Sequence, residues 1–292
     1  MWQRRGYKKN NPATKHQAAI PPSVYKHAIR HARTHRRRAI SRLLGAAFFF
    51  AMRSCEYTKV RGARLTRTVQ VKRVRFFQRR REISHDDSSI FDADSVTIEF
   101  ERQKNSKKFV SITMPRSKDP VLCPVKLLAD TIQRIRSYPG FTPEWTIDMA
   151  MDDRGVVRRI TSAEVADMIK SSVRAIGKDV LGFGPADVGT HSNRSASAMA
   201  MYLANVPVFT IMLIGRWSSD AFLLYIRKQI QDFTSGVSDL MTLNGSFFTI
   251  PGLQSNNEDP RSRHDQQSFA SASQIGGNVN RRVTEPRFHL NY

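Results

Sequence analysis

The apolar positions in the first half of the chain predict one buried helix followed by a small sheet. Residues 40–52 are almost entirely apolar, which favours a buried helix that ends close to Arg53. Between residues 65 and 77, valines alternate with basic residues, which favours a strand with one basic face. Residues 96–100 and 110–114 also alternate and flank a polar, turn-prone stretch, so they predict a β-hairpin with lysines at its tip.

The pattern after Pro120 predicts helices only. Pro124 can open a helix that runs to about Ser137. Thr161 and Glu164 have the spacing of a capping box, which predicts a helix to about residue 176. The remaining expected helices cover residues 191–205, residues 207–215, and a last segment that begins at Ser218 or Ser219 and carries Tyr225.

The two ends of the chain lack this periodicity, so the pattern divides the chain into three parts. Residues 1–38 are basic and contain Asn, Pro and Gly, which favours a flexible arm. Residues 246–292 are rich in Asn, Ser, Gln and Gly, which favours disorder. Residues 39–245 are expected to form an α+β core, mainly α with a small antiparallel β-sheet. The hydrophobic fraction of 40% in 292 residues is sufficient for such a core.

The charge of the chain predicts a polyanionic partner. The formal net charge is +22. The chain up to Arg81 contains 23 Lys or Arg residues and a single acidic residue, Glu56. Binding to nucleic acid would release counterions from the phosphates and would therefore be strong and sensitive to salt. An anionic membrane is the alternative, but we find neither a lipid-anchor motif nor an apolar run long enough to span a bilayer. We therefore expect double-stranded DNA as the partner, and no membrane.

The cysteine content and the N-terminal sequence favour a reduced, intracellular protein. Cys55 and Cys123 are too few for a metal site or a disulfide framework. The sequence has no apolar N-terminal stretch typical of a signal peptide. No carboxylate cluster fits a two-metal site, so we expect neither a metal nor a small-molecule cofactor.

Several residues could together act on a phosphodiester. His191 and Arg194 are three positions apart, so on a helix they share a face and can address one phosphate. Arg53 offers a guanidinium fork that matches a phosphate, and Glu56 could either orient it or simply neutralise it. Each feature alone also has a structural explanation, since a basic helix can hold His-x-x-Arg by chance.

Three further residues complete the set. Trp217 and Tyr225 have apolar neighbours, which is also typical of core aromatic residues. Lys104 lies at the tip of the expected hairpin, where Lys107 and Lys108 are alternatives for the same role. Phosphodiester cleavage needs a nucleophile, positive charge around the phosphate and an acid for the leaving oxygen, and these residue types can supply all three.

The order of these residues resembles the tyrosine recombinase (phage integrase) family. The phrases that carry a narrower resemblance, to eukaryotic members in Crypton-type mobile elements, are Arg53-Ser54-Cys55-Glu56, Leu122-Cys123-Pro124-Val125 and Gly215-Arg216-Trp217-Ser218-Ser219-Asp220-Ala221-Phe222. The resemblance covers residues 40–235. It implies the catalytic-domain fold of that family, assembly of several protomers on DNA, and a nuclear location in a eukaryote.

The resemblance also implies a role for each residue. Arg53 and Arg194 would clamp the scissile phosphate, and His191 would be the general acid/base. Trp217 would donate its indole N–H to a phosphate oxygen. Lys104 would protonate the departing 5′-oxygen, and Tyr225 would be the nucleophile that forms a 3′-phosphotyrosyl link. That link conserves the bond energy, so rejoining the strand needs neither ATP nor metal.

The sequence departs from the better-known bacterial pattern in three ways. Trp217 stands where His is commoner, and its distance of eight positions from Tyr225 is one shorter than in bacterial relatives. Only about 38 residues precede the catalytic part, where the family places a core-binding domain. Two alternatives therefore stay open: a relative that binds DNA without cutting it, and a type IB topoisomerase-like enzyme that relaxes DNA.

Overall fold

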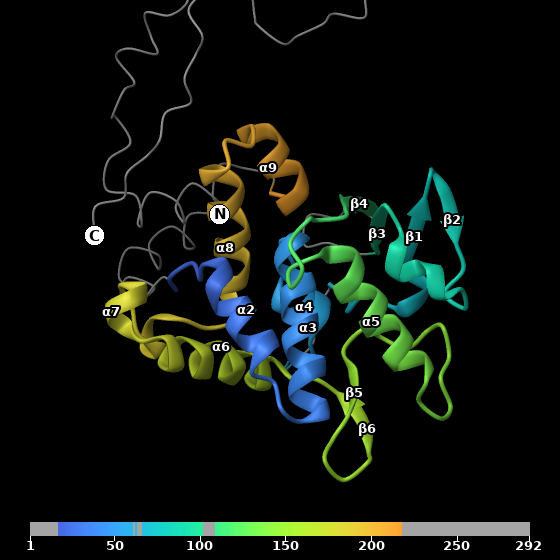
Figure 1. The fold of residues 1–292 in the computed structure, drawn as a ribbon, viewed down its shortest axis with the longest axis horizontal. Helices are drawn as coiled ribbons and strands as arrows, with labels where there is room; N and C mark the ends of the chain where they lie inside the picture. Colours follow the sequence, from blue (N-terminus) through green and yellow to red (C-terminus); the bar gives the residue numbers. More distant parts are fainter. Residues whose placement is uncertain (1–16, 61, 63–65, 102–108, 218–292) are drawn as a thin grey trace, which may run out of the picture. The chain divides into compact units, whose positions relative to one another are not determined.

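The computed structural model describes residues 17–60, 62, 66–101 and 109–217, all of which belong to a unit that covers residues 1–233 (Figure 1). Its longer helices are α2 (Pro22–Arg30), α3 (His35–Phe49), α5 (Pro124–Arg136), α6 (Ser162–Ile176), α8 (Thr190–Leu203) and α9 (Val208–Gly215). Its strands are β1 (Val74–Gln78), β2 (Arg81–Ile83), β3 (Ser95–Phe100), β4 (Val110–Pro115), β5 (Met149–Met151) and β6 (Val157–Arg159). Its short helices are α4 (Ser54–Tyr57), α7 (Lys178–Leu181), η1 (Val71–Arg73), η2 (Ser88–Asp92) and η3 (Pro185–Asp187).

Helix α3 is the centre of the core. It is apolar on nearly every side beyond its first turn, and it packs against α2, α5, α6 and α8 (Figure 1). Thr34 caps its start by accepting the N–H of Arg37 at 3.2 Å. The predicted buried helix is thus confirmed, with its first residue earlier and its last residue three positions before the expected end.

The sheet is antiparallel, with strand order β2-β1-β3-β4. Strands β3 and β4 form the predicted hairpin, with Phe100 opposite Val110, and the residues of its tip, 102–108, lie outside the described residues. Helix α5 contacts both of these strands. The expected strand over 65–77 is shorter than predicted, because β1 begins only at Val74.

The expected basic face of β1 is largely neutralised by acids from neighbouring segments. Arg73, directly before the strand, forms an ion pair with Glu99 of β3. Arg75 lies 3.5 Å from Glu82 of β2. These acids belong to other strands, so they are not visible in the alternating pattern of residues 65–77. The pattern therefore predicted a basic face, whose charge is neutralised by pairing between strands.

The expectation of helices only after Pro120 is wrong at one place, the hairpin of β5 and β6. Its strands have three residues each, too few for an alternating pattern to stand out. Asp152 shapes its turn by accepting the N–H groups of Arg154 and Val156, each at 3.0 Å.

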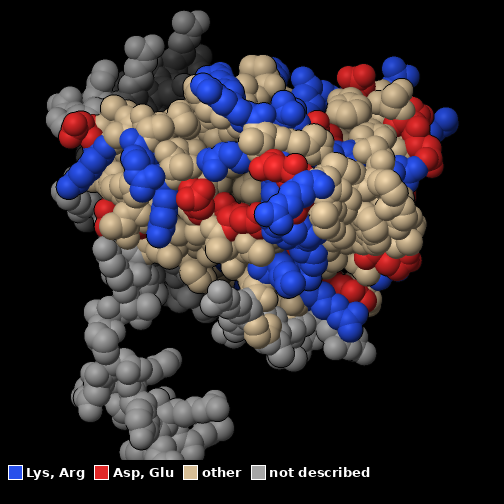
Figure 2. All heavy atoms as spheres, turned by 90° about the horizontal axis from the view of Figure 1, so that it is seen from below, with Lys and Arg blue, Asp and Glu red and all other residues tan. Residues whose placement is uncertain are grey.

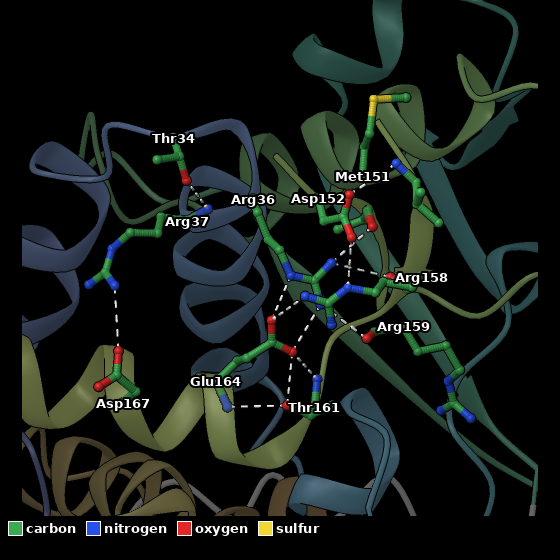
Figure 3. A network of polar contacts seen from close by, with 12 residues as sticks. Thr34, Arg36, Arg37, Met151, Asp152, Arg158, Arg159, Thr161, Glu164 and Asp167 are labelled. Carbon is green, nitrogen blue, oxygen red and sulfur yellow. Dashed lines mark hydrogen bonds and ion pairs between the residues drawn. The ribbon is translucent and has the colours of Figure 1, made fainter. Parts of the chain in front are cut away.

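Arg36 joins this hairpin to α3 and α6 (Figure 3). Its Nε and Nη2 donate to Glu164 at 2.6 and 2.9 Å, and its Nη1 donates to the carbonyl oxygen of Ala150 at 3.0 Å. Glu164 also completes the predicted capping box by accepting the N–H of Thr161 at 2.8 Å. One bidentate ion pair therefore fixes three segments that are distant in the sequence.

Part of the segment expected to be a flexible arm is folded. Helix α2 lies within residues 1–38 and buries Val24, Tyr25 and Ala28 against the core. Tyr25 donates its hydroxyl hydrogen to Asn193 Oδ1 of α8 at 2.9 Å. The basic residues around these positions hid the apolar face, so the core begins well before residue 39.

The other long helices follow the predictions closely. Helices α5, α6, α8 and α9 begin within two residues of their expected starts. Between α7 and α8, residues 182–189 contain only the short η3. The helix expected to carry Tyr225 and the tail expected to be disordered both lie outside the described residues.

Candidate active site

The candidate site lies where the C-terminal ends of α3 and α9 meet. The last carbonyl groups of a helix have no partner within the helix. At the end of α3, the N–H groups of Ala51 and Met52 reach back to the carbonyl oxygens of Phe48 and Ala47, at 3.2 and 3.0 Å. This is the hydrogen-bond pattern of a Schellman motif, in which Ala51 takes the left-handed position with φ 44°.

Helix α9 ends in the same way. The N–H groups of Arg216 and Trp217 reach the carbonyl oxygens of Leu213 and Met212, at 3.1 and 3.0 Å. The left-handed residue is Arg216, with φ 54°, and not the neighbouring Gly215. Gly215 is needed for space, because a Cβ there would lie 1.7 Å from Cζ3 of Trp217.

Both helix ends therefore store backbone strain. A left-handed conformation costs a non-glycine residue about 1–2 kcal/mol, although Asn tolerates it. Asn205, which follows the end of α8, has φ 56° and fits that preference. Ala51 and Arg216 do not follow it, and strain of this kind gathers at functional sites.

Arg194 of α8 joins the two helix ends. Its side chain is buried, with 6% of the residue exposed. Its Nη1 donates to the carbonyl oxygen of Ala51 at 2.7 Å, and its Nη2 donates to the carbonyl oxygen of Gly215. The ring of Trp217 lies over the guanidinium, 4.4 Å from Cζ to the ring centroid. A cation is favourable at this place, because the C-terminal ends of helices carry partial negative charge.

Arg216 is the second buried cation of the site, with 7% of the residue exposed. Its Nη1 donates to the carbonyl oxygen of Phe50 at 2.9 Å, and its Nη2 donates to Glu56 Oε2 at 2.7 Å. The guanidinium stacks on Phe100, with Cζ 3.8 Å from the ring centroid. Burial lowers the pKa of Arg216, and the negative charge of Glu56 opposes that shift.

Glu56 is fully buried and bridges Arg216 to Arg53. Its Oε1 accepts from Arg53 Nη1 at 3.0 Å, and its Oε2 accepts the backbone N–H of Arg53 at 2.8 Å. Arg53 stands at the N-cap of α4, and its side chain is 23% exposed. Glu56 therefore holds Arg53 from both its backbone and its guanidinium, the contact expected of a carboxylate that orients it.

His191 lies in the first turn of α8, one turn before Arg194, and is exposed. Gly189 at the N-cap has no side chain to accept an N–H from that turn. Gln17 does so instead, since its Oε1 accepts the N–H of His191 at 2.9 Å. The two residues of the His-x-x-Arg pair thus differ in environment: one guanidinium is enclosed and one imidazole faces solvent.

The structure brings together four of the residues singled out from the sequence, Arg53, Glu56, Arg194 and Trp217, with His191 one helical turn away. Lys104 and Tyr225 lie outside the described residues, as do Lys107 and Lys108. Sequence reasoning missed Arg216. Arg216 stands in one of the phrases that carry the family resemblance, but it also follows the end of an apolar helix, where an arginine that binds the last carbonyl groups is common.

The remaining chemistry near the site is limited. Burial raises the pKa of the Cys55 thiol, and the neighbouring Glu56 raises it further, so a reactive thiolate is disfavoured. In the described part of the chain, no group of three His, Cys, Asp or Glu residues could hold a metal ion. No helix among the described residues is both long and apolar enough to cross a bilayer.

Charge is mixed on the face of the protein that is seen from below in the orientation of Figure 1. In that view, Lys and Arg side chains lie next to Asp and Glu side chains (Figure 2). The face includes the region of α6 and the β5–β6 hairpin, where Arg158 lies 3.1 Å from Asp152. This ion pair joins one cation to one anion, whereas at the candidate site two arginines share Glu56.

No family model and no curated protein matches the sequence. Solved structures do match the fold. The XerH site-specific recombinase bound to palindromic difH substrate, in a post-cleavage complex, superposes with a TM-score of 0.51 and 14% identity. The match covers 79% of this chain and 56% of that chain, so this chain spans just over half the length of XerH.

Two other solved structures give lower scores. The Tn1549 transposon integrase in complex with transposon right end DNA has a TM-score of 0.45 and 9% identity, over 80% of this chain and 68% of that chain. The FLP recombinase–Holliday junction complex has a TM-score of 0.40 and 12% identity, over 78% and 47%. The likeness to XerH shows the fold: the chain has the catalytic-domain fold of tyrosine recombinases, mainly helical with a small antiparallel sheet.

Proposed function

We propose that this protein cleaves and rejoins DNA strands through a covalent phosphotyrosyl intermediate, with Tyr225 as the nucleophile. One observation carries the proposal: Arg194 reaches the turn that leads into Arg53, since its Nη1 donates to Ala51 at 2.7 Å. Two arginines that are far apart in the sequence thus belong to neighbouring segments, in the fold of the XerH site-specific recombinase.

The chemistry proposed for this site is in-line displacement at phosphorus. The Tyr225 oxygen forms a bond to the scissile phosphate, and the bond to the 5′-oxygen of the next nucleotide breaks. Arg53 and Arg194 hold the charge that develops on the phosphate oxygens, and the Trp217 indole donates a further N–H. His191 accepts the tyrosyl proton, and Lys104 donates one to the departing oxygen.

Support from charge comes from the whole chain, whose formal net charge is +22. Such an excess of cations favours a polyanion as partner, and the phosphates of double-stranded DNA are the matching chemistry. Assembly of several protomers on DNA, a nuclear location and a mobile-element origin of the Crypton type stay predictions.

The decisive experiment traps the covalent intermediate. Radiolabelled duplexes of randomised sequence, each with a nick that lets the cleaved end diffuse away, are mixed with the full chain and resolved on a denaturing gel. The wild-type protein should give a protein–DNA band of retarded mobility. Tyr225→Phe should give none, because it removes the attacking oxygen and little else.

The same gel separates the alternatives. Arg53→Ala and Arg194→Ala should each lower the yield of covalent complex by about 100-fold or more, because each removes a charge that stabilises the transition state. Wild-type protein that binds these duplexes in a salt-dependent manner but never forms the covalent band would instead be a DNA-binding relative. Relaxation of supercoiled plasmid by a single protomer would identify a topoisomerase-like enzyme.

A further inference from the structure

The carboxylate of Glu56 is shared between two guanidinium groups. Oε1 accepts from Arg53 at 3.0 Å, and Oε2 accepts from Arg216 at 2.7 Å. One carboxylate cannot neutralise two arginines, so the trio keeps a formal charge of +1. Without Arg216, the carboxylate would be matched by Arg53 alone, and the attraction of Arg53 for an anion would be weaker.

Arg216 also fixes the position of the carboxylate. Its two terminal nitrogens form a fork, in which Nη2 holds Glu56 while Nη1 holds the carbonyl oxygen of Phe50 at 2.9 Å. Phe50 belongs to the turn between α3 and α4, which leads directly to Arg53. The fork therefore locks together the carboxylate and the backbone that presents Arg53.

The backbone conformation of Arg216 supports the importance of its contact with Glu56, because an arginine takes this conformation only at a cost in free energy. Arg216 takes the left-handed conformation, with φ 54°, at a position where glycine or asparagine avoids the cost. In this conformation the side chain of Arg216 reaches Glu56 and the carbonyl oxygen of Phe50, the residue that follows α3. Trp217 is the next residue, and Tyr225 lies nine positions after Arg216 in the sequence.

We infer that Arg216 is a positioning residue, which ties the end of α9 to Arg53 through Glu56. The inference deepens the proposed function and rests on it, since Arg53 and Tyr225 have their roles only there. Arg216 acts through Glu56, whose carboxylate it binds at 2.7 Å, and through the carbonyl oxygen of Phe50. In this way it sets the charge and the position of Arg53.

The chain offers a matched control for this inference. Arg36 is as buried as Arg216, at 6% exposed, and also binds a glutamate, but it belongs to the network of α3, α6 and the β5–β6 hairpin (Figure 3). Arg36→Met and Arg216→Met each remove a buried guanidinium from a carboxylate. A general effect of lost stability should therefore appear in both variants, and an effect on positioning should appear only in Arg216→Met.

The first test measures the rate of covalent complex formation separately from DNA affinity. Arg216→Met should slow the covalent step by about 100-fold, a typical effect of misplaced catalytic groups, with DNA affinity changed by less than about threefold. Arg216→Lys should recover part of the rate, because it keeps the charge beside Glu56 but not the fork. Arg36→Met should match wild type per folded molecule. Equal rates in Arg216→Met and Arg36→Met would overturn the inference.

The second test does not depend on cleavage, so it distinguishes failure of the inference from failure of the proposed function. The amide of Glu56 donates to Arg53 at 2.8 Å and that of Trp217 donates to Met212 at 3.0 Å. Hydrogen exchange at both amides should quicken by about tenfold or more in Arg216→Met and stay at wild-type rates in Arg36→Met. Exchange at Glu56 that does not respond to Arg216→Met would refute the coupling, whether or not the wild type cuts DNA.

A third variant covers the case in which Arg216→Met does not fold. Arg216→Gly removes the same guanidinium but relieves the left-handed strain, so its backbone should form at least as readily. It should show the same loss of covalent complex and the same faster exchange at Glu56. Wild-type behaviour of Arg216→Gly in both measurements would assign the left-handed turn, and not the guanidinium, as the feature that matters, and would overturn the inference.

Discussion

Two buried arginines of this protein, Arg36 and Arg216, each bind a carboxylate, but their surroundings differ in charge balance. Arg36 and Glu164 belong to a network with Arg158 and Asp152, which holds two cations and two anions. The neighbouring Arg37 and Arg159 (Figure 3) are paired in turn, with Asp167 and Asp148. Arg216 shares Glu56 with Arg53, so two cations face one anion. The first region is neutral in formal charge, and the second keeps a positive charge.

The two regions also differ in strain and in hydrogen bonding. Arg36 lies inside α3, and all three of its side-chain nitrogens donate hydrogen bonds. Arg216 has a left-handed backbone, and its Nε is buried with no hydrogen-bond partner. A buried ion network that only supports the fold is expected to be balanced and relaxed, whereas excess charge and strain are typical of a site that acts on a ligand.

The largest expected effect comes from neutralising the carboxylate of each region in turn, Glu56 in one variant and Glu164 in another. Glu56→Gln leaves two guanidiniums close together with no anion, and should lower the free energy of unfolding by about 3–5 kcal/mol. Glu164→Gln should cost less, about 1–2 kcal/mol, because Glu164 is partly exposed and water can replace its contacts. Urea unfolding measures both variants. A larger loss for Glu164→Gln would break the contrast between the regions.

The second effect tests the packing of Trp217 against the helix end. Gly215→Ala places a Cβ 1.7 Å from the Trp217 ring, so the ring must leave the Arg194 guanidinium. We expect a loss of about 1–3 kcal/mol, the usual cost of overpacking, and a shift in tryptophan fluorescence.

Gly45→Ala is the matched control for this substitution. Gly45 lies inside α3, and its new Cβ would meet the flexible ends of Leu127, Ile29 and Leu122, at 3.1, 3.3 and 3.7 Å. Alanine favours a helix over glycine, so this variant should be near neutral and should leave the fluorescence of Trp217 unchanged. Similar losses for both variants would show that the ring of Trp217 is not held in place by Gly215.

The third effect separates the regions by pH. Burial alone would raise the pKa of Glu164, but hydrogen bonds from Arg36 and Thr161 outweigh it and lower the pKa from 4.5 to about 2. A lowered pKa means that the contact stabilises the fold fully above pH 4.5, and that this contribution is lost as pH falls toward 2. The difference in unfolding free energy between wild type and Glu164→Gln should therefore shrink over that window, by about 1–2 kcal/mol. A difference that stays constant from pH 5 to pH 2 would contradict this account.

Local patterns in the sequence predicted most of the helices but not the pairing between distant segments. The capping box at Thr161 and the apolar run of α3 carry their information within a few residues, so both helices were predicted. Helix α2 was missed because basic residues surround its buried face, and the β5–β6 hairpin was missed because its strands are short. The acidic partners of the arginines at β1 were missed because pairing across strands has no local signature.

The candidate site shows the same division. The order of Arg53, Arg194 and Trp217 in the sequence resembled a known constellation. In the structure, Arg194 contacts Trp217 and binds the carbonyl oxygen of Ala51, two residues before Arg53. Arg216 carried no such signal, because its burial depends on where α9 ends relative to α3. The strain at Ala51 was also unreadable, since alanine gives no indication of a left-handed conformation.

The smallest expected effect concerns that strain. Ala51→Gly should relieve the left-handed conformation at the end of α3 and raise the free energy of unfolding by up to about 1 kcal/mol, after the entropy that glycine loses on folding. Asn205→Gly is the control at the end of α8, where asparagine already tolerates φ 56°, so its gain should be only a few tenths of a kcal/mol. Thermal unfolding of both variants measures the difference.

The strained turn also has a link to activity, because the carbonyl oxygen of Ala51 accepts a hydrogen bond from Arg194. A stabilised Ala51→Gly protein with a slower covalent step would indicate that the strained turn serves activity at the expense of stability. Equal gains at both positions would show that the site stores no more strain than an ordinary helix end.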